Sequence, residues 1–252
     1  MREKLIALSM VKKGDWSEID KYLQQDSDLN SIDNVTAFQL VDQLNFEVVT
    51  MFDADYPEAW RDMAKPPFVV YLQGNRKLLT GKIVAIVGGK RPSEYTKKAV
   101  QNLMRKLPAD VGVVTGLELG AEVYASDHAK NRLACLASGF IADDFYRKHP
   151  AYNQFNNDDL MISEFPPNVK FELQAYFRTY HLLVELSEVV CVFEMPTSDL
   201  RMKFLNYLTE VGKQVVVLPD KKTQNTTGGL GLINRGARCL LHVRDVTDLL
   251  DD

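Results

Sequence analysis

Short apolar runs alternate with longer stretches of mixed polarity from Phe68 to the end of the chain. The runs are rich in Val, Ile and Leu, and several are apolar throughout, which is typical of parallel strands covered on both faces. We predict strands over residues 68–74, 82–89, 111–116, 132–138, 160–165, 188–195, 214–220 and 238–243. Between them, helical patterns cover residues 93–107, 118–131, 179–187, 198–213 and 227–236. This alternation predicts an α/β fold with a doubly wound, mostly parallel Rossmann-like sheet.

The N-terminal part of the chain follows a different pattern. Short helical patterns are separated there by polar turns, and acidic residues dominate. Residues 1–60 hold 5 Lys/Arg against 12 Asp/Glu, whereas residues 61–252 hold 25 against 22. We therefore predict a small acidic helical cap over residues 1–45 and an extended Rossmann-like domain over residues 46–252.

Length and composition allow one sizeable hydrophobic core. The chain has 252 residues, of which 46% are hydrophobic. Its first 16 residues lack the apolar segment and cleavage site of a signal peptide, and no run approaches the roughly 20 apolar residues of a membrane-spanning helix. We therefore expect a cytoplasmic protein without a membrane partner.

Residues that could carry catalysis are sparse. Cys135, Cys191 and Cys239 each lie inside an apolar run without metal-ligand spacing, so we expect reduced core residues. The four histidines are scattered, and neither G-x-S-x-G nor H-E-x-x-H occurs. The dinucleotide fingerprint G-x-G-x-x-G is missing from the first strand-to-helix turn. We expect no metal, no cofactor and no enzymatic activity.

The turn after the strand at residues 82–89 is the first candidate binding site. Gly88 and Gly89 let the backbone approach a ligand closely, and Ser93 can cap the following helix. Backbone amides at a helix N-terminus favour a phosphate, and Lys90 and Arg91 add positive charge beside them. We interpret this turn as a phosphate site; the alternative is a tight turn followed by a solvated basic helix.

Two further segments are candidates. Thr115 and Gly116 repeat the strand–glycine–helix arrangement and could form the opposite wall of the same crevice, or an ordinary turn. Arg178 could meet a phosphate, while Tyr180 or His181 could stack on an unpaired base. The alternative for this segment is that Tyr176 and Phe177 are core residues and His181 lies on the surface.

These segments resemble the DNA-processing protein A (DprA/Smf) family in their order and spacing. The resemblance is carried by PPFVVYLQGN (66–75), AIVGGKRPSEY (85–95), VTGLELG (114–120), ISEFPP (162–167) and GLINRGA (231–237). It implies a Rossmann-like fold that forms a homodimer, binds and protects incoming single-stranded DNA in natural transformation, and helps to load the RecA recombinase. It implies no catalytic step.

Several positions depart from the pattern of that family. Gly89 and Lys90 stand where the family usually has Ser-Arg, so the bidentate guanidinium is replaced by a point charge. Glu118 replaces a small residue, and Thr179 to His181 replace an Arg-Asn-Arg sequence. Asp220 replaces a glycine. Each lost cation would weaken the hold on a phosphate.

Two other functions stay open at this point. Similar folds in the lysine-decarboxylase-like phosphoribohydrolases bind nucleotides or phosphosugars, with Glu194 as the carboxylate to test as a base. The stretch from Thr227 to Asn234 is only a loose echo of their glycine-rich pattern. Alternatively, the chain is a paralogue whose ligand site has decayed and which acts as a protein-interaction scaffold.

Overall fold

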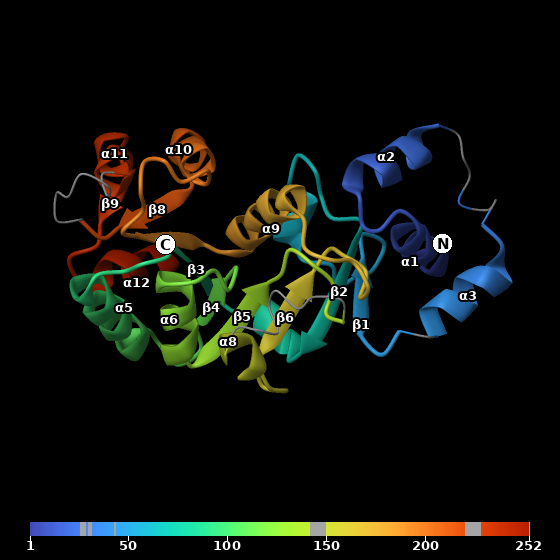
Figure 1. Ribbon diagram of the computed structural model, residues 1–252, viewed down its shortest axis with the longest axis horizontal. Helices are drawn as coiled ribbons and strands as arrows, with labels where there is room; N and C mark the ends of the chain where they lie inside the picture. The colour runs from blue at the N-terminus through green and yellow to red at the C-terminus, as the bar shows by residue number, and fades with distance from the viewer. Residues whose placement is uncertain (26–28, 30–31, 43, 142–149, 220–227, 252) are drawn as a thin grey trace. The chain divides into compact units, whose positions relative to one another are not determined.

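The computed structural model describes residues 1–25, 29, 32–42, 44–141, 150–219 and 228–251 (Figure 1). Its helices and strands group into two compact units, each built from two segments of the chain. Unit 1 comprises residues 1–76 and 135–185, and unit 2 comprises residues 77–134 and 186–252. The predicted boundary at residue 45 is not the line along which these units divide, and it stays a prediction.

Unit 2 contains a parallel sheet of six strands in the order β5-β4-β3-β7-β8-β9. Its strands are β3 (Ile83–Gly88), β4 (Gly112–Thr115), β5 (Asn131–Cys135), β7 (Val189–Phe193), β8 (Gln214–Val217) and β9 (Arg238–Cys239). β3 pairs with β7 over five residues, from Val84 opposite Val189 to Gly88 opposite Phe193. All residues of β3 and β7 are buried, as expected for strands covered on both faces.

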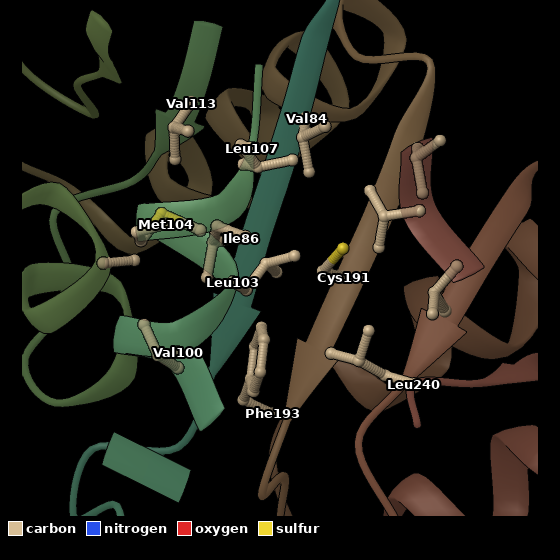
Figure 2. Close-up of a cluster of buried hydrophobic side chains, with 14 of the residues drawn as sticks. Val84, Ile86, Val100, Leu103, Met104, Leu107, Val113, Cys191, Phe193 and Leu240 are labelled. Atoms are coloured by element: carbon tan, nitrogen blue, oxygen red, sulfur yellow. The ribbon is translucent and has the colours of Figure 1, made fainter. Parts of the chain in front are cut away.

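Helices cover both faces of this sheet. They are α5 (Glu94–Lys106), α6 (Ala121–His128), α10 (Met202–Glu210), α11 (Gly228–Asn234) and α12 (Arg244–Asp251). In Figure 1, α5, α6 and α12 lie on one face and α10 and α11 on the other. Figure 2 shows the core under α5, where Leu103 and Met104 face Ile86 of β3 and Phe193 of β7. This is the predicted doubly wound arrangement.

Unit 1 combines the N-terminal helices with a small antiparallel sheet. Its strands β1 (Glu47–Thr50), β2 (Val69–Gly74) and β6 (Leu160–Ser163) pair in the order β1-β2-β6. Its helices are α1 (Arg2–Val11), α2 (Trp16–Gln24), α3 (Asn34–Asp42), α4 (Glu58–Arg61), α8 (Pro150–Asn153) and α9 (Leu173–Leu186). A short 3₁₀ segment, η2 (Arg76–Thr80), follows β2. α1 packs against α3, β1 and β2, so the N-terminal helices belong to the same unit as the small sheet.

The fold class predicted from the sequence is confirmed, with differences at element ends. α9 begins at Leu173, before the predicted start at residue 179. α6 begins at Ala121 rather than at residue 118, because Leu117 and Gly120 have positive φ angles that interrupt a helix. β9 ends at Cys239, since the Asp245 carboxylate accepts hydrogen bonds from the Leu241 and His242 amides. The helix that follows, α12, was not predicted.

Two of the three cysteines are core residues, as predicted. Cys135 and Cys191 are buried, and burial raises the pKa of both thiols. Cys239 is only partly buried, so that part of the prediction was wrong for this residue. Among the described residues, no helix combines the length and apolar character needed to cross a lipid bilayer.

Candidate nucleic-acid interface

The sheet of unit 2 has a point at which strand order reverses. From β3 the chain proceeds outward through β4 and β5, whereas β7, β8 and β9 follow in the opposite direction. In open α/β sheets, ligands bind beyond the carboxyl ends of the strands at this point. A pocket of about 380 Å³ lies between the ends of β3 and β7. We call it the switch-point crevice; it is lined by Gly89, Lys90, Arg91, Glu194, Pro196, Ser198 and Asp199.

The backbone amides of the first turn are occupied by acceptors of the protein itself. The Gly89 amide donates to the Phe193 carbonyl at 3.0 Å. The Ser93 amide donates to the Glu194 carboxylate at 2.6 Å. Ser93 caps α5 as predicted, because its hydroxyl accepts from the Thr96 amide at 3.3 Å. The expectation that the amides of Gly89 and Ser93 are open to a phosphate is therefore corrected.

The Glu194 carboxylate accepts a hydrogen bond from a backbone amide that was predicted to bind a phosphate. The φ angle of Glu194 is +44°, a left-handed conformation that non-glycine residues adopt rarely. From there, its carboxylate meets the start of α5 across the crevice. Gly88 and Gly89 are buried, and a Cβ atom on Gly89 would lie 2.3 Å from the Glu194 carbonyl oxygen. Glycine is thus required there for close packing of two backbones.

Backbone amides of the second turn, between β4 and α6, also have hydrogen-bond acceptors within the protein. The Gly116 amide donates to the Glu122 carboxylate at 2.9 Å, and the Thr115 hydroxyl accepts from the Leu117 amide at 3.3 Å. Thr115 and Gly116 are buried. These two residues shape the loop that precedes α6. The Gly116 amide already has an acceptor and both residues are buried, which argues against their predicted contact with DNA.

Arg201 joins the three loops at the carboxyl ends of β3, β4 and β7. Its guanidinium lies 2.6 Å from Glu122, 2.8 Å from Asp199 and 3.0 Å from the Gly88 carbonyl oxygen. Arg201 is 1% exposed and Glu122 is fully buried, so this ion pair is shielded from solvent. Burial alone would raise the pKa of Asp199, but the hydrogen bond and charge of Arg201 outweigh it and hold that pKa below its ordinary value.

Two exposed cations remain at the entrance of the crevice. The Lys90 ammonium lies 3.2 Å from the Glu118 carboxylate, which is buried. Arg91 is exposed and makes no ion pair with any residue that the structure describes. Among the described residues, the crevice therefore offers an anion the guanidinium of Arg91 and the partly neutralised ammonium of Lys90.

The third candidate segment lies in unit 1, on α9. Arg178 donates through two nitrogens to the Glu164 carboxylate, at 2.7 and 3.1 Å. Burial raises the pKa of Glu164, although the charge of Arg178 opposes this effect. Arg178 is therefore held by a buried partner and keeps only part of its charge for a ligand.

Tyr180 and His181 differ in their access to solvent. Tyr180 is 2% exposed, and its ring packs edge-on against Tyr176 at 5.0 Å, so it presents no face to a base. Tyr180 is therefore a core residue, whereas Tyr176 and Phe177, which the alternative placed in the core, are only partly buried. His181 is exposed; partial desolvation, and then the charges of Arg178 and Lys65, lower its pKa. His181 thus carries less positive charge at a given pH than an ordinary histidine.

Comparison with known proteins assigns the family. The model of the DNA recombination-mediator protein A family matches residues 47–251, which includes the crevice and the buried Arg201 network. The chain belongs to this family. The resemblance to DprA/Smf proteins is therefore confirmed, and the family is named for mediating recombination rather than for a catalysed reaction.

Three relatives define how far the likeness to this family extends. Protein Smf of Synechocystis sp. is 28% identical over 249 residues, covering 94% of this chain but only 61% of Smf. The X-ray structure of DprA from Streptococcus pneumoniae superposes with a TM-score of 0.77 at 20% identity, covering 98% of this chain and 93% of that one. DprA from Helicobacter pylori, described for its single-stranded DNA binding mode, superposes with a TM-score of 0.71 at 22% identity. The match covers 82% of this chain and 98% of that one.

Two departures from the family pattern compensate each other. Lys90 stands where an arginine is usual and Glu118 where a small residue is usual, and their side chains form an ion pair. Asp220, Thr226 and Thr227 lie outside the described residues. The roles of Glu122, Asp199 and Arg201 were not predicted from the sequence. Their only signal there was three charged residues beside strand ends that are otherwise apolar.

Proposed function

We propose that the chain binds single-stranded DNA, with phosphates of the strand at the Lys90 and Arg91 side of the switch-point crevice. The observation that carries this proposal is the exposed pair of cations at the point where the strand order reverses, in a member of the recombination-mediator family. Binding rather than catalysis fits the site, because the Glu194 carboxylate is engaged by the Ser93 amide instead of facing a substrate as a base.

The charge around this crevice supports a polyanion as ligand. Arg91 makes no ion pair within the described residues, and α5 adds the exposed Lys98, whereas Lys97 pairs with Glu94 at 2.7 Å. The Helicobacter pylori relative is described as binding single-stranded DNA. Arg91 and Lys90 act through side-chain charge, since the neighbouring amides of Gly89 and Ser93 already have acceptors.

The test is a double substitution that removes both entrance charges. We expect Lys90→Gln/Arg91→Gln to weaken binding of a labelled oligothymidylate. The slope of log affinity against log salt should also flatten by about 0.7 for each phosphate that the variant no longer neutralises. Fluorescence anisotropy between about 50 and 200 mM salt measures both quantities.

The chain provides a matched control at the C-terminal end of α5, the helix that follows the turn with Lys90 and Arg91. Arg105→Gln/Lys106→Gln removes one arginine and one lysine roughly 17 Å away along the axis of α5. Affinity should fall much less in this variant. Equal losses of affinity in the two variants would mean that net charge alone explains the effect, and would refute the proposed site. No binding by the folded wild-type chain at low salt would refute the function and favour the scaffold alternative.

We further propose that the chain acts as a homodimer that protects incoming single strands in natural transformation and assists the loading of a RecA-type recombinase. The family name supports a role as recombination mediator. The chain spans about three fifths of the length of the Synechocystis relative, so these roles are inferred for the segment of that protein that this chain matches.

A further inference from the structure

Unit 1 contains two neighbouring hollows that the proposed function does not use. The first, of about 350 Å³, is lined by Trp16, Lys65 and Arg178 among others, and we call it the Trp16 hollow. The second, of about 590 Å³, is lined by Phe46 and Ile141 among others, and we call it the Phe46 hollow. Both volumes are in the range of ligand sites. The two hollows share Lys13, Val169, Lys170 and Glu172, so they adjoin along one wall.

Trp16 is the aromatic surface of the first hollow. Its ring stacks on Phe68 at 5.3 Å with an interplanar angle of 24°, and its indole NH donates to the Pro66 carbonyl at 2.8 Å. The Lys65 ammonium and the Arg178 guanidinium lie 5.1 and 5.8 Å from the centre of the ring. The indole is thus fixed in place, with Phe68 stacked on it and both cations over its ring, so a base that stacks on it takes the place of these cations and brings its phosphate next to them.

The charges that line the Trp16 hollow favour an anion. Five side chains are basic and three are acidic: Lys12, Lys13, Lys65, Lys170 and Arg178 against Asp15, Glu18 and Glu172. Two of the bases are paired, Lys12 with Glu18 and Arg178 with Glu164, and Asp15 caps α2. Lys13, Lys65 and Lys170 form no ion pair with any described residue. The local balance is therefore opposite to that of the acidic N-terminal part as a whole.

The shared wall of the two hollows is held by close backbone packing. Gly14 has a φ angle of +73°, and a Cβ atom there would lie 2.8 Å from the Glu164 carbonyl oxygen. Its amide donates to the Ser9 carbonyl at 2.9 Å. This glycine turn holds the backbone between Lys13 and Trp16 against the segment that leads to Lys170.

The Phe46 hollow offers a second, more apolar surface. Phe46 and Ile141 line it together with Leu44 and Pro166, and the Phe46 ring packs against Phe140 at 5.2 Å. The polar side chains on this side include the same Lys13 and Lys170. An aromatic surface therefore lies on each side of a pair of lysines.

We propose that the Trp16 and Phe46 hollows take two neighbouring unstacked bases of single-stranded DNA, with the phosphate between them on Lys13 and Lys170. This inference rests on the proposed function and adds a contact region in unit 1. Stacking on aromatic rings beside a cationic groove is the usual mode of binding an unpaired strand. The acidic N-terminal segment thus contributes a binding surface rather than only a cap.

Tryptophan fluorescence tests this proposal directly. The chain has two tryptophans, and Trp60 is fully buried with no hydrogen-bond partner for its indole NH among the described residues. The full-length Trp60→Phe variant therefore reports on Trp16 alone without losing a hydrogen bond. We expect oligothymidylate to quench its emission along the same binding curve that anisotropy gives.

Two substitutions measure the contribution of the hollows to affinity. Trp16→Leu should weaken binding about 5- to 150-fold, the effect of losing one base stack. Lys170→Gln should weaken binding and flatten the salt dependence by about 0.7, and because this side chain is exposed the variant keeps its fold. Lys21→Gln is the matched control, since Lys21 is an exposed lysine of unit 1 that lines neither hollow.

The outcomes separate this inference from the proposed function. Anisotropy that reports binding while Trp16 emission is unchanged would overturn the inference and leave the function intact. Equal affinities for Lys170→Gln and Lys21→Gln would also overturn it. Quenching by an acidic peptide but not by the oligonucleotide would assign the hollows to a protein partner instead. No anisotropy change at all would mean that the proposed function itself has failed.

Discussion

At the scale of single residues, charge pairing decides which cations can meet a phosphate. Lys90 shares its charge with the buried Glu118, and Arg178 shares its charge with the buried Glu164, whereas Arg91 has no such partner among the described residues. Because a buried carboxylate holds its cation more firmly than solvent does, these pairs lower the charge that a strand of DNA can use.

The Lys90–Glu118 pair gives a prediction of gained affinity. Glu118→Gln removes the carboxylate charge and leaves the side-chain size unchanged. The freed Lys90 ammonium should then bind a phosphate, so affinity for oligothymidylate should rise and its salt slope steepen by about 0.7. Anisotropy titrations against salt measure both.

The control for that prediction removes the same charge elsewhere in unit 2. Glu210→Gln breaks an exposed ion pair with Arg235, in which the two side chains lie 3.2 Å apart. This variant should bind DNA as the wild type does. If both variants gained affinity equally, net charge rather than the freed lysine would be responsible.

Residue roles were only partly predictable from the sequence. Ser93 was correctly predicted to cap a helix, because a cap depends on neighbours within four residues. The carboxylates that occupy the amides could not be predicted. Glu194 meets an amide 101 positions away in the chain, and Arg201 meets a carboxylate 79 positions away. Such contacts depend on strand order and on loop conformations that local patterns do not encode.

At the scale of elements, the loop between β4 and α6 depends on one glycine. Gly120 has a φ angle of +95°, and a Cβ atom there would lie 2.3 Å from the Gly89 carbonyl oxygen and 2.5 Å from the Lys90 carbonyl carbon. It lets the start of α6 lie directly against the turn after β3. The Ala121 amide then donates to the Gly89 carbonyl at 3.1 Å, which joins the two loops.

We predict that Gly120→Ala destabilises the fold by more than backbone strain alone. Strain at a left-handed residue costs about 1–3 kcal/mol, and the clash with Gly89 and Lys90 adds to it. Gly212→Ala is the matched control, since Gly212 has a φ angle of +82° but nothing within 4 Å of the place that a methyl group would take. Urea denaturation of both variants measures the difference, and equal decreases in stability would contradict the close-approach argument.

Element types were more predictable than element ends. Apolar runs of strand length identified β3, β4 and β7, because strands buried on both faces have few polar positions. The end of β9 and the start of α12 depend on the Asp245 side chain, which accepts from the Leu241 and His242 amides at 2.7 and 2.6 Å. Such a side-chain contact competes with strand geometry and leaves no trace in hydrophobic periodicity.

At the scale of the whole molecule, a net charge of −4 gives no general attraction to DNA. Binding must therefore come from local groups of cations, of which the crevice entrance in unit 2 and the Trp16 hollow in unit 1 are the two described above. Affinity should consequently fall only moderately with added salt, because the salt slope grows with the number of phosphates neutralised and these groups supply few such contacts.

The proposed assembly can be tested on the intact chain. Light scattering should give twice the 28.6 kDa of one chain, and a complex of dimer and oligothymidylate should retain a purified RecA-type recombinase on size exclusion. Lys90→Gln/Arg91→Gln should keep the dimer and lose the DNA-dependent retention. A monomeric mass would refute the homodimer, and retention without DNA would favour the scaffold alternative.

The interleaved path of the chain has a consequence for its synthesis. Val84 of β3 pairs with Val189 of β7, 105 positions later in the sequence. At about 5–20 residues per second, a ribosome needs roughly 5–20 s to make that interval. Until then one edge of β3 has unpaired amides and carbonyls and can join a strand of another nascent chain. Folding yield should therefore depend on chaperones that cover this edge during translation.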